Sequence, residues 1–197
     1  MASQLEDMRH YAEEMHIPVA SHDTSSLLHI IGGIIRPSKI LEIGTAIGYT
    51  AILMSDILCI PGRIDTVEKD DVSAVIARAN IKKAGLDDII SLIEGDALEV
   101  INCLTSRYDM IFLDAAKGQY PLFLPGCLRL LRQGGILISD NVLFKGLVEG
   151  KEIAPRKKRT IVVRLREYIK SLNSTPGLET VVLNAGDGIA ISLKHHE

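Results

Sequence analysis

The chain has 197 residues, a net charge of −3 at pH 7 and 47% hydrophobic residues. This length predicts a single domain over residues 1–197, and this composition excludes a disordered chain and a wholly basic nucleic-acid coat protein. Its three cysteines are widely spaced, so we expect neither a disulfide framework nor a zinc knuckle. The charged start and the lack of a long apolar stretch predict a cytoplasmic protein with no signal peptide and no membrane partner.

Apolar runs alternate with helical patterns along the chain. The predicted helices cover residues 5–16, 23–35, 49–58, 70–84, 97–104, 121–132 and about 160–172. The predicted strands cover residues 39–44, 63–68, 89–94, 108–115, 136–140, 179–183 and 188–193. The expected helix ends are an N-cap at Asp23, Thr24 or Ser25, a stop at Gly85 and a stop at Gly134-Gly135.

The order of these elements predicts the fold class. Strands separated by helices form parallel βαβ units, whereas the short turn at 184–187 allows only an antiparallel pair. We therefore expect an α/β fold, with a mostly parallel seven-stranded sheet, a reversed strand near the C-terminus and helices on both faces. Ligands bind such sheets beyond the carboxyl ends of the strands, so the residues that follow each strand are the candidates for function.

The ends of the first three strands suggest an adenosine-type cofactor. Glycines at 44 and 48 let the backbone turn tightly and approach a ligand. The loop lacks the dinucleotide spacing and the P-loop Lys-Ser/Thr, which favours a ligand without a pyrophosphate. Glu68 is placed to accept hydrogen bonds from ribose hydroxyls. Asp96 is either part of an adenine pocket or the N-cap of the next helix.

The fourth and fifth strands end in oxygen-bearing side chains. If these strands are neighbours, about 4.8 Å apart, then Asp114, Asp140 and Asn141 converge within reach of one cation. An oxygen-only set favours Mg²⁺, Mn²⁺ or Ca²⁺, although two N-caps and a turn asparagine would look the same in the sequence. Lys117 lies three residues after Asp114. It is either a general base beside the cation or a surface lysine.

Basic residues are concentrated late in the chain. Between residues 151 and 170 the cations are Lys151, Arg156, Lys157, Lys158, Arg159, Arg164, Arg166 and Lys170. Only Glu152 and Glu167 oppose them. The run indicates either a phosphate-contacting patch or a solvated loop and helix face. Phe144 and Tyr120 are candidates to stack on a base, or they belong to the core.

Six ordered motifs carry a family resemblance: LEIGTAIGYT, TVEKD, GDAL, YDMIFLDAAKGQY, DNVLFKG and GDGIAIS. They resemble the cation-dependent class I O-methyltransferases, a family that includes the catechol and caffeoyl-CoA enzymes, from about residue 15 to residue 193. AIGYT, DAAKGQY, DNVLFKGLV and the basic run are similar, within that family, to the bacterial tRNA 5-hydroxyuridine methyltransferases. Those enzymes make 5-methoxyuridine at the wobble position.

The resemblance implies a Rossmann-like class I methyltransferase fold, S-adenosylmethionine (SAM) as methyl donor, Mg²⁺ (or Mn²⁺ or Ca²⁺) and a homodimer. The residues implied to bind SAM are Ala20, Glu42, Gly44, Thr50, Glu68, Asp96, Ala97 and Asp114. The implied metal ligands are Asp114, Asp140 and Asn141, and the implied catalytic residues are Lys117 and Asp114. Family members carry about one more helix before residue 5, where it helps to cover the active site and form the dimer.

Two acceptor classes remain open. Methyl transfer to oxygen is an in-line displacement that needs an aligned oxyanion. Catechol and 5-hydroxyuridine both offer two neighbouring oxygens, so the cation does not discriminate between them. The basic residues Arg156, Lys157, Lys158 and Arg159 favour a tRNA anticodon loop, with a small catechol-like substrate as the alternative. A nicotinamide dehydrogenase is disfavoured by the missing G-x-G-x-x-G, and a non-catalytic RNA-binding module by the intact site motifs.

Overall fold

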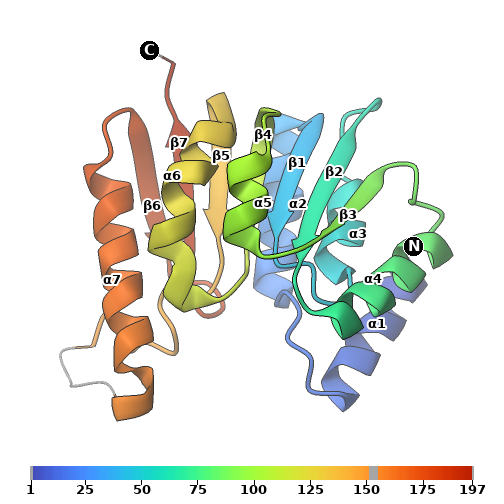
Figure 1. Ribbon diagram of the computed structural model, residues 1–197, viewed down its shortest axis with the longest axis horizontal. Helices are drawn as coiled ribbons and strands as arrows, with labels where there is room; N and C mark the ends of the chain where they lie inside the picture. The colour runs from blue at the N-terminus through green and yellow to red at the C-terminus, as the bar shows by residue number, and fades with distance from the viewer. Residues whose placement is uncertain (1, 151–154, 197) are drawn as a thin grey trace. The chain divides into compact units, whose positions relative to one another are not determined.

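The computed structural model describes residues 2–150 and 155–196 (Figure 1). The chain divides into two compact units, Met1–Val100 and Ile101–Glu197, called here the N-terminal unit and the C-terminal unit. Within the described ranges, no helix is both long and apolar enough to span a membrane. The single domain expected from the chain length stays a prediction.

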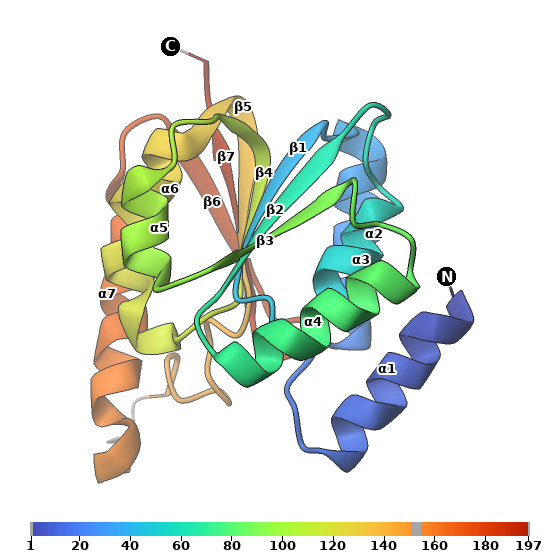
Figure 2. The ribbon, with the colours of Figure 1, turned by 45° about the vertical axis from the view of Figure 1, so that its right-hand side comes forward.

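The N-terminal unit holds the first three strands. They are β1 (Lys39–Ile43), β2 (Arg63–Glu68) and β3 (Ile90–Glu94), parallel and in the order β3-β2-β1. The helices are α1 (Ala2–Glu14), α2 (His22–Ile35), α3 (Tyr49–Ser55) and α4 (Asp71–Lys83), and α5 (Ala97–Cys103) contains the boundary between the units. Helices α3 and α4 pack on β2 and β3 (Figure 2). Because the three strands are parallel, their carboxyl ends lie at the same edge of the sheet.

The C-terminal unit holds the other four strands, in the order β4-β5-β7-β6. They are β4 (Tyr108–Leu113), β5 (Leu131–Ser139), β6 (Leu178–Leu183) and β7 (Ile189–Lys194). The helical segments are η1 (Lys117–Gln119), α6 (Tyr120–Leu130), η2 (Arg156–Lys158) and α7 (Arg159–Ser174). Strand β4 is parallel to β5, whereas β7 is antiparallel to both β5 and β6. The predicted reversed strand is therefore confirmed, and it is β7.

The core of the C-terminal unit is built around β4, whose six residues are all buried. Continuous burial along a strand is expected where both of its faces are covered. Helices α6 and α7 pack against each other and against β5 and β6 respectively (Figure 1). Three tyrosines, Tyr108, Tyr120 and Tyr168, have no exposed surface. Each buried aromatic side chain contributes about 1.5–3 kcal/mol to folding, so these rings hold the unit together.

Two predicted helix ends are wrong. The N-cap of α2 is Ser21, whose side chain accepts a hydrogen bond from the Thr24 backbone N–H at 3.1 Å. Gly134-Gly135 does not close α6 but lies inside β5, which begins directly after the helix because Leu131 already pairs with Tyr108. Gly134 has a φ of 74°, which lets the strand absorb a register shift opposite Tyr108 and Met110. Gly85 follows α4 as predicted, with a φ of 67°.

Candidate functional site

The loop after β1 folds across the end of β2. The Gly44 backbone N–H donates to the Val67 carbonyl at 3.0 Å, and the Ala46 N–H donates to Glu68 Oε2 at 2.8 Å. Gly44 and Gly48 have φ values of 104° and 84°, a region that favours glycine. The glycines predicted from the sequence therefore bring this loop onto the acidic residue that ends β2.

Backbone groups hold the Glu68 carboxylate. Besides the bond from Ala46, its Oε1 accepts the N–H groups of Lys69 and Asp70, each at 2.9 Å. An ionised carboxylate has about four acceptor positions, so one remains for a further donor such as a hydroxyl. Its predicted role, holding the ribose of a cofactor, stays a prediction.

Glu42, in β1, belongs to a buried hydrogen-bond network that reaches the loop. Its side chain is 0% exposed and its Oε2 accepts the Thr66 hydroxyl at 2.5 Å. Thr66 Oγ1 in turn lies 2.6 Å from Thr45 Oγ1, so the network reaches the glycine loop. The structure therefore gives Glu42 a place that supports the loop, and its contact with SAM stays a prediction.

The other predicted cofactor residues of this unit have different surroundings. Asp96 Oδ1 accepts the Leu98 N–H at 2.9 Å, so Asp96 caps α5, the structural alternative that the sequence left open. Ala97 is the first residue of that helix. Ala20 and Thr50 are buried, with 2% and 7% exposure. Their contacts with a cofactor stay predictions.

In the C-terminal unit, β4 and β5 are neighbours, as the metal prediction requires. Leu113 pairs with Ser139, so Asp114 and Asp140 follow paired positions. The Asp140 N–H donates to the Leu113 carbonyl at 3.0 Å, and Asp140 Oδ1 accepts the Asn141 N–H at 2.7 Å. Asn141 has a φ of 55°, a left-handed conformation that asparagine tolerates better than most residues.

Lys117 is not a solvated surface lysine. Its Nζ donates to Asp114 Oδ1 and lies 5.8 Å from the centroid of the Tyr120 ring. Its side chain is 19% exposed and that of Asp114 is 22% exposed. Lys117 is the first residue of the short helix η1 and lies three residues after Asp114 in the sequence. The two predicted catalytic residues are therefore in direct contact.

A buried tyrosine braces the ends of β4 and β5. The Tyr120 hydroxyl lies 3.1 Å from both the Leu113 and the Asp140 carbonyl oxygens and donates to this pair. Burial, with Asp114 nearby, raises the pKa of Tyr120 well above its usual value, so the hydroxyl stays a donor. Tyr120 is 0% exposed, so the expectation that it could stack on a base is wrong.

A second tyrosine extends this brace, and the sequence analysis missed it. The Tyr168 ring meets the Tyr120 ring edge to face, with centroids 5.3 Å apart. The Tyr168 hydroxyl lies 2.6 Å from Ser139 Oγ, one residue before Asp140. The only available signal was the apolar spacing of the helix around residues 160–172, which does not identify the partner.

The segment of residues 142–150, called here the 142–150 loop, directly follows the candidate ligands. The Val142 N–H donates to the Gly188 carbonyl at 2.9 Å, and the Leu143 N–H donates to the Asp187 carbonyl at 3.0 Å. The Asp187 carboxylate also accepts the Lys145 N–H. Asp187 therefore holds the loop that follows the candidate ligands, through both its carbonyl and its carboxylate.

The basic run does not form one continuous free patch. Lys151 and Glu152 lie outside the described residues. Arg156, Lys157 and Arg159 are exposed, whereas Lys158 Nζ lies 5.8 Å from the centroid of Phe144. Arg164 pairs with Glu167 at 3.3 Å, and Arg166 donates to carbonyls of the 142–150 loop. Internal contacts therefore occupy part of the predicted phosphate-binding surface.

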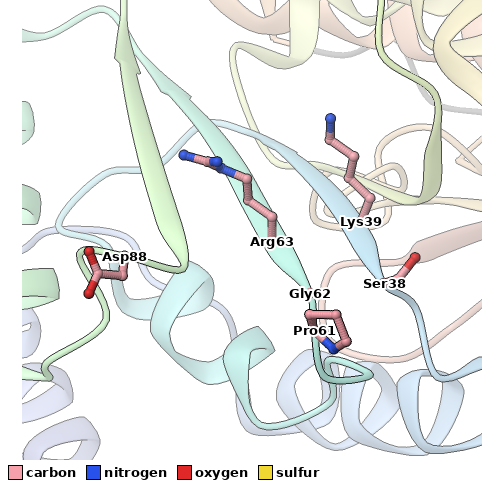
Figure 3. A pocket seen from close by; sticks show the side chains of 6 residues that line it. All are labelled: Ser38, Lys39, Pro61, Gly62, Arg63 and Asp88. Carbon is pink, nitrogen blue, oxygen red and sulfur yellow. The ribbon is translucent and has the colours of Figure 1, made fainter.

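One hollow in the N-terminal unit was not expected from the sequence (Figure 3). It measures about 370 Å³ and is lined by Ser38, Lys39, Pro61, Gly62, Arg63 and Asp88. It lies at the amino ends of β1 and β2, the opposite ends from Gly44 and Glu68. Lys39 and Arg63 are both paired with Asp65, at 3.8 and 3.9 Å. This hollow has no part in the candidate site.

Comparisons with known proteins support one family. The family model described as O-methyltransferase matches residues 3–195. A catechol O-methyltransferase of Mycobacterium tuberculosis is 28% identical, over 92% of this chain and 83% of that protein. A Staphylococcus aureus structure assigned as a caffeoyl-CoA O-methyltransferase is 35% identical, with a TM-score of 0.90 over 96% of this chain and 91% of that one.

A third relative bears on the cofactor. An O-methyltransferase of Bacillus cereus, solved in complex with S-adenosylhomocysteine, is 28% identical. Its TM-score is 0.86, over 98% of this chain and 90% of that one. These similarities confirm the predicted Rossmann-like methyltransferase fold. By its sequence, its fold and its motifs, this chain belongs to the O-methyltransferase family and is a SAM-dependent enzyme.

Proposed function

We propose that the chain transfers the methyl group of SAM to a hydroxyl of a small catechol-type acceptor, which carries two neighbouring oxygens. The observation that carries the methyl transfer to such an oxygen pair is the paired ends of β4 and β5, where Asp114 and Asp140 follow register partners and Lys117 contacts Asp114. The names of two relatives described above refer to catechol and caffeoyl-CoA, which supports a small acceptor.

The side chains at these strand ends are suited to a hard divalent cation. Asp114, Asp140 and Asn141 offer two carboxylates and an amide oxygen, the donors that Mg²⁺ prefers. Among the described residues, no three His, Cys, Asp or Glu side chains gather as a metal site, and the proposed set uses asparagine as its third member. A cation held there would favour the deprotonated form of the acceptor hydroxyl.

The residues of the chain then have separate tasks. Lys117 is the general base of this proposal, and its Nζ takes the acceptor hydroxyl proton. The oxygen forms its bond to the methyl carbon as the carbon–sulfur bond breaks, and S-adenosylhomocysteine leaves. Asp114 holds the Lys117 side chain, and Tyr120 holds the backbone from which Asp114 and Asp140 project. Glu68 binds the ribose hydroxyls of SAM.

The tRNA wobble position remains the second candidate acceptor, because Arg156, Lys157 and Arg159 are exposed. It ranks second because Lys158 and Arg166 contact the chain itself. The homodimer, the cytoplasmic location and the choice of Mg²⁺ stay predictions from the sequence.

A methyl-transfer assay with labelled SAM and Mg²⁺ separates the two acceptors. A catechol, caffeoyl-CoA and tRNA containing 5-hydroxyuridine are compared at matched concentrations, each with and without a chelator. We expect chelator-sensitive transfer to catechol or caffeoyl-CoA. Transfer to tRNA alone, lost in an Arg156→Ala/Lys157→Ala variant, would overturn the small-molecule proposal.

A further inference from the structure

The 142–150 loop is held from one side by the turn before β7. Three backbone N–H groups of the loop donate to Asp187 and Gly188, as described above. The packing on this side is close, because a Cβ built on Gly188 would lie 2.2 Å from Leu143 Cγ. This first anchor is therefore both hydrogen-bonded and tightly packed.

The opposite side of the loop faces α7 and is less well packed. A hollow of about 350 Å³ lies there, lined by Leu143, Val148, Glu149, Arg166, Ile169, Lys170 and Val182. Apolar contacts alone therefore do not fix this side of the loop. Hydrogen bonds from α7 cross to the loop on this side.

Arg166 supplies those bonds. Its Nε donates to the Val148 carbonyl at 2.9 Å, and its Nη2 donates to the carbonyls of Gly150 at 2.8 Å and Leu147 at 3.2 Å. A guanidinium is a planar fork with five N–H donors, so one side chain can bind three carbonyls at once. Hydrogen bonds from a charged donor are stronger than neutral ones.

The conformation of the loop requires such an anchor. Phe144 and Lys145 have φ values of 47° and 58°, a region that bulky side chains rarely adopt. Backbone conformations of this kind are unfavourable and persist only where the surroundings enforce them. The strained residues lie between Asn141, a candidate ligand, and the carbonyls that Arg166 binds.

We propose that Arg166 is a positioning residue for methyl transfer: it holds the 142–150 loop so that Asn141 keeps its place beside Asp140, where the acceptor hydroxyl would bind. This inference rests on the proposed function, because it assigns the loop to the acceptor. It also changes the role of Arg166 from a phosphate contact, as the basic run suggested, to an internal anchor.

The first experiment measures the loop itself and needs no substrate. Hydrogen exchange of the wild-type chain is compared with that of Arg166→Ala, Arg166→Lys and Arg164→Ala. The Leu147, Val148 and Gly150 amides should exchange at least about tenfold faster in Arg166→Ala. Arg166→Lys should be intermediate, because an ammonium is a point donor that lacks the fork.

Arg164→Ala is the matched control. It removes the same charge two residues away on α7, where Arg164 is exposed and pairs with Glu167. It should leave loop exchange unchanged. If Arg166→Ala is poorly folded, Arg166→Lys carries the test, with the thermal midpoint measured for each variant.

The second experiment measures catalysis. In Arg166→Ala, kcat/KM for the acceptor should fall about 10- to 100-fold, the cost of a misplaced site, while the SAM dissociation constant changes less than twofold. Faster loop exchange with unchanged kcat/KM would overturn the positioning role, and unchanged loop exchange would overturn the anchor. A wild-type chain that methylates no small acceptor would refute the proposed function, while the exchange comparison would still decide whether Arg166 holds the loop.

Discussion

The two units hold their acidic side chains by different means. In the N-terminal unit, the Glu68 carboxylate is held by backbone N–H groups of three nearby residues. In the C-terminal unit, the ends of β4 and β5 are held by the Tyr120 side chain, and the following loop by the Arg166 side chain. Asp114 is held by the Lys117 side chain.

This difference predicts how each unit responds to substitution. Any residue except proline supplies a backbone N–H, so the surroundings of Glu68 tolerate changes of neighbouring side chains. A hydroxyl or a guanidinium is lost with the residue that carries it. Substitutions distant in the sequence should therefore disturb the ends of β4 and β5 more than the surroundings of Glu68.

The largest effect is expected at the paired strand ends. Asp140→Ala removes a candidate cation ligand, and we expect kcat to fall by more than about 100-fold, since even residues that only support metal ligands cost 10- to 100-fold. Activity is measured with Mg²⁺ and with a chelator. Full activity of this variant, or wild-type activity that survives chelation, would remove the cation from the proposal.

The next effect tests the base. Lys117→Met removes the amine but keeps a long side chain, and we expect kcat to fall by about 10²–10⁴-fold, the usual contribution of a general base. The SAM dissociation constant, measured by calorimetry, should stay the same. A variant as active as the wild type would exclude Lys117 from the proton transfer.

In the N-terminal unit, comparing substitutions of Glu68 and of its neighbour Lys69 tests whether backbone groups hold the carboxylate. Glu68→Ala should weaken SAM binding about tenfold or more, because charged hydrogen bonds contribute about 1.5–3 kcal/mol. Lys69→Ala keeps the backbone N–H that Glu68 accepts, so it should leave SAM affinity unchanged. Equal loss of affinity in both variants would contradict the conclusion that backbone N–H groups, rather than side chains, hold Glu68.

A smaller effect is expected at the tyrosines. Tyr120→Phe keeps the buried ring but removes the hydroxyl at the ends of β4 and β5, which should cost about 1–2 kcal/mol of unfolding free energy. Tyr168→Phe removes the contact with Ser139 at a similar cost. We expect kcat to fall more in Tyr120→Phe, measured beside urea unfolding. A larger fall of kcat in Tyr168→Phe than in Tyr120→Phe would contradict the role of Tyr120 in holding these strand ends.

The smallest effect is a change of stability at high pH. Burial raises the pKa of the Cys127 thiol from 9.0 to about 12. The unfolded chain therefore releases this proton first, and the stabilisation present below pH 9 is lost as the pH rises towards 12. The unfolding free energy of Cys127→Ala should fall less steeply between pH 8 and 10 than that of the wild type. Equal slopes would refute this contribution.

The sequence predicted much of the fold because its signals are local. The glycine loop, the strand-ending acids and the short turn at 184–187 each lie within a few residues of one another. The closeness of Asp114 and Asp140 was predicted by assuming that β4 and β5 are neighbours, and the register of Leu113 with Ser139 confirms that assumption. The early start of β5 was missed because it depends on the pairing of Leu131 with Tyr108, which no local pattern reveals.

The supporting side chains were missed for the same reason. Arg166 looked like one of eight cations on a basic stretch, and only the folded chain shows that it faces the carbonyls of Val148 and Gly150. Tyr168 looked like one apolar position of a helix. Such contacts join segments far apart in the sequence, so composition and periodicity do not predict them.

The position of β7 has a consequence for the order in which the protein is made. This strand lies between β5 and β6, and the turn before it supplies Asp187 and Gly188 to the 142–150 loop. A ribosome synthesises both residues well after the loop itself, so a growing chain carries β5 with one edge open and the loop without its first anchor. We expect trypsin to cleave a chain arrested before residue 184 at Lys145 faster than it cleaves the finished protein there.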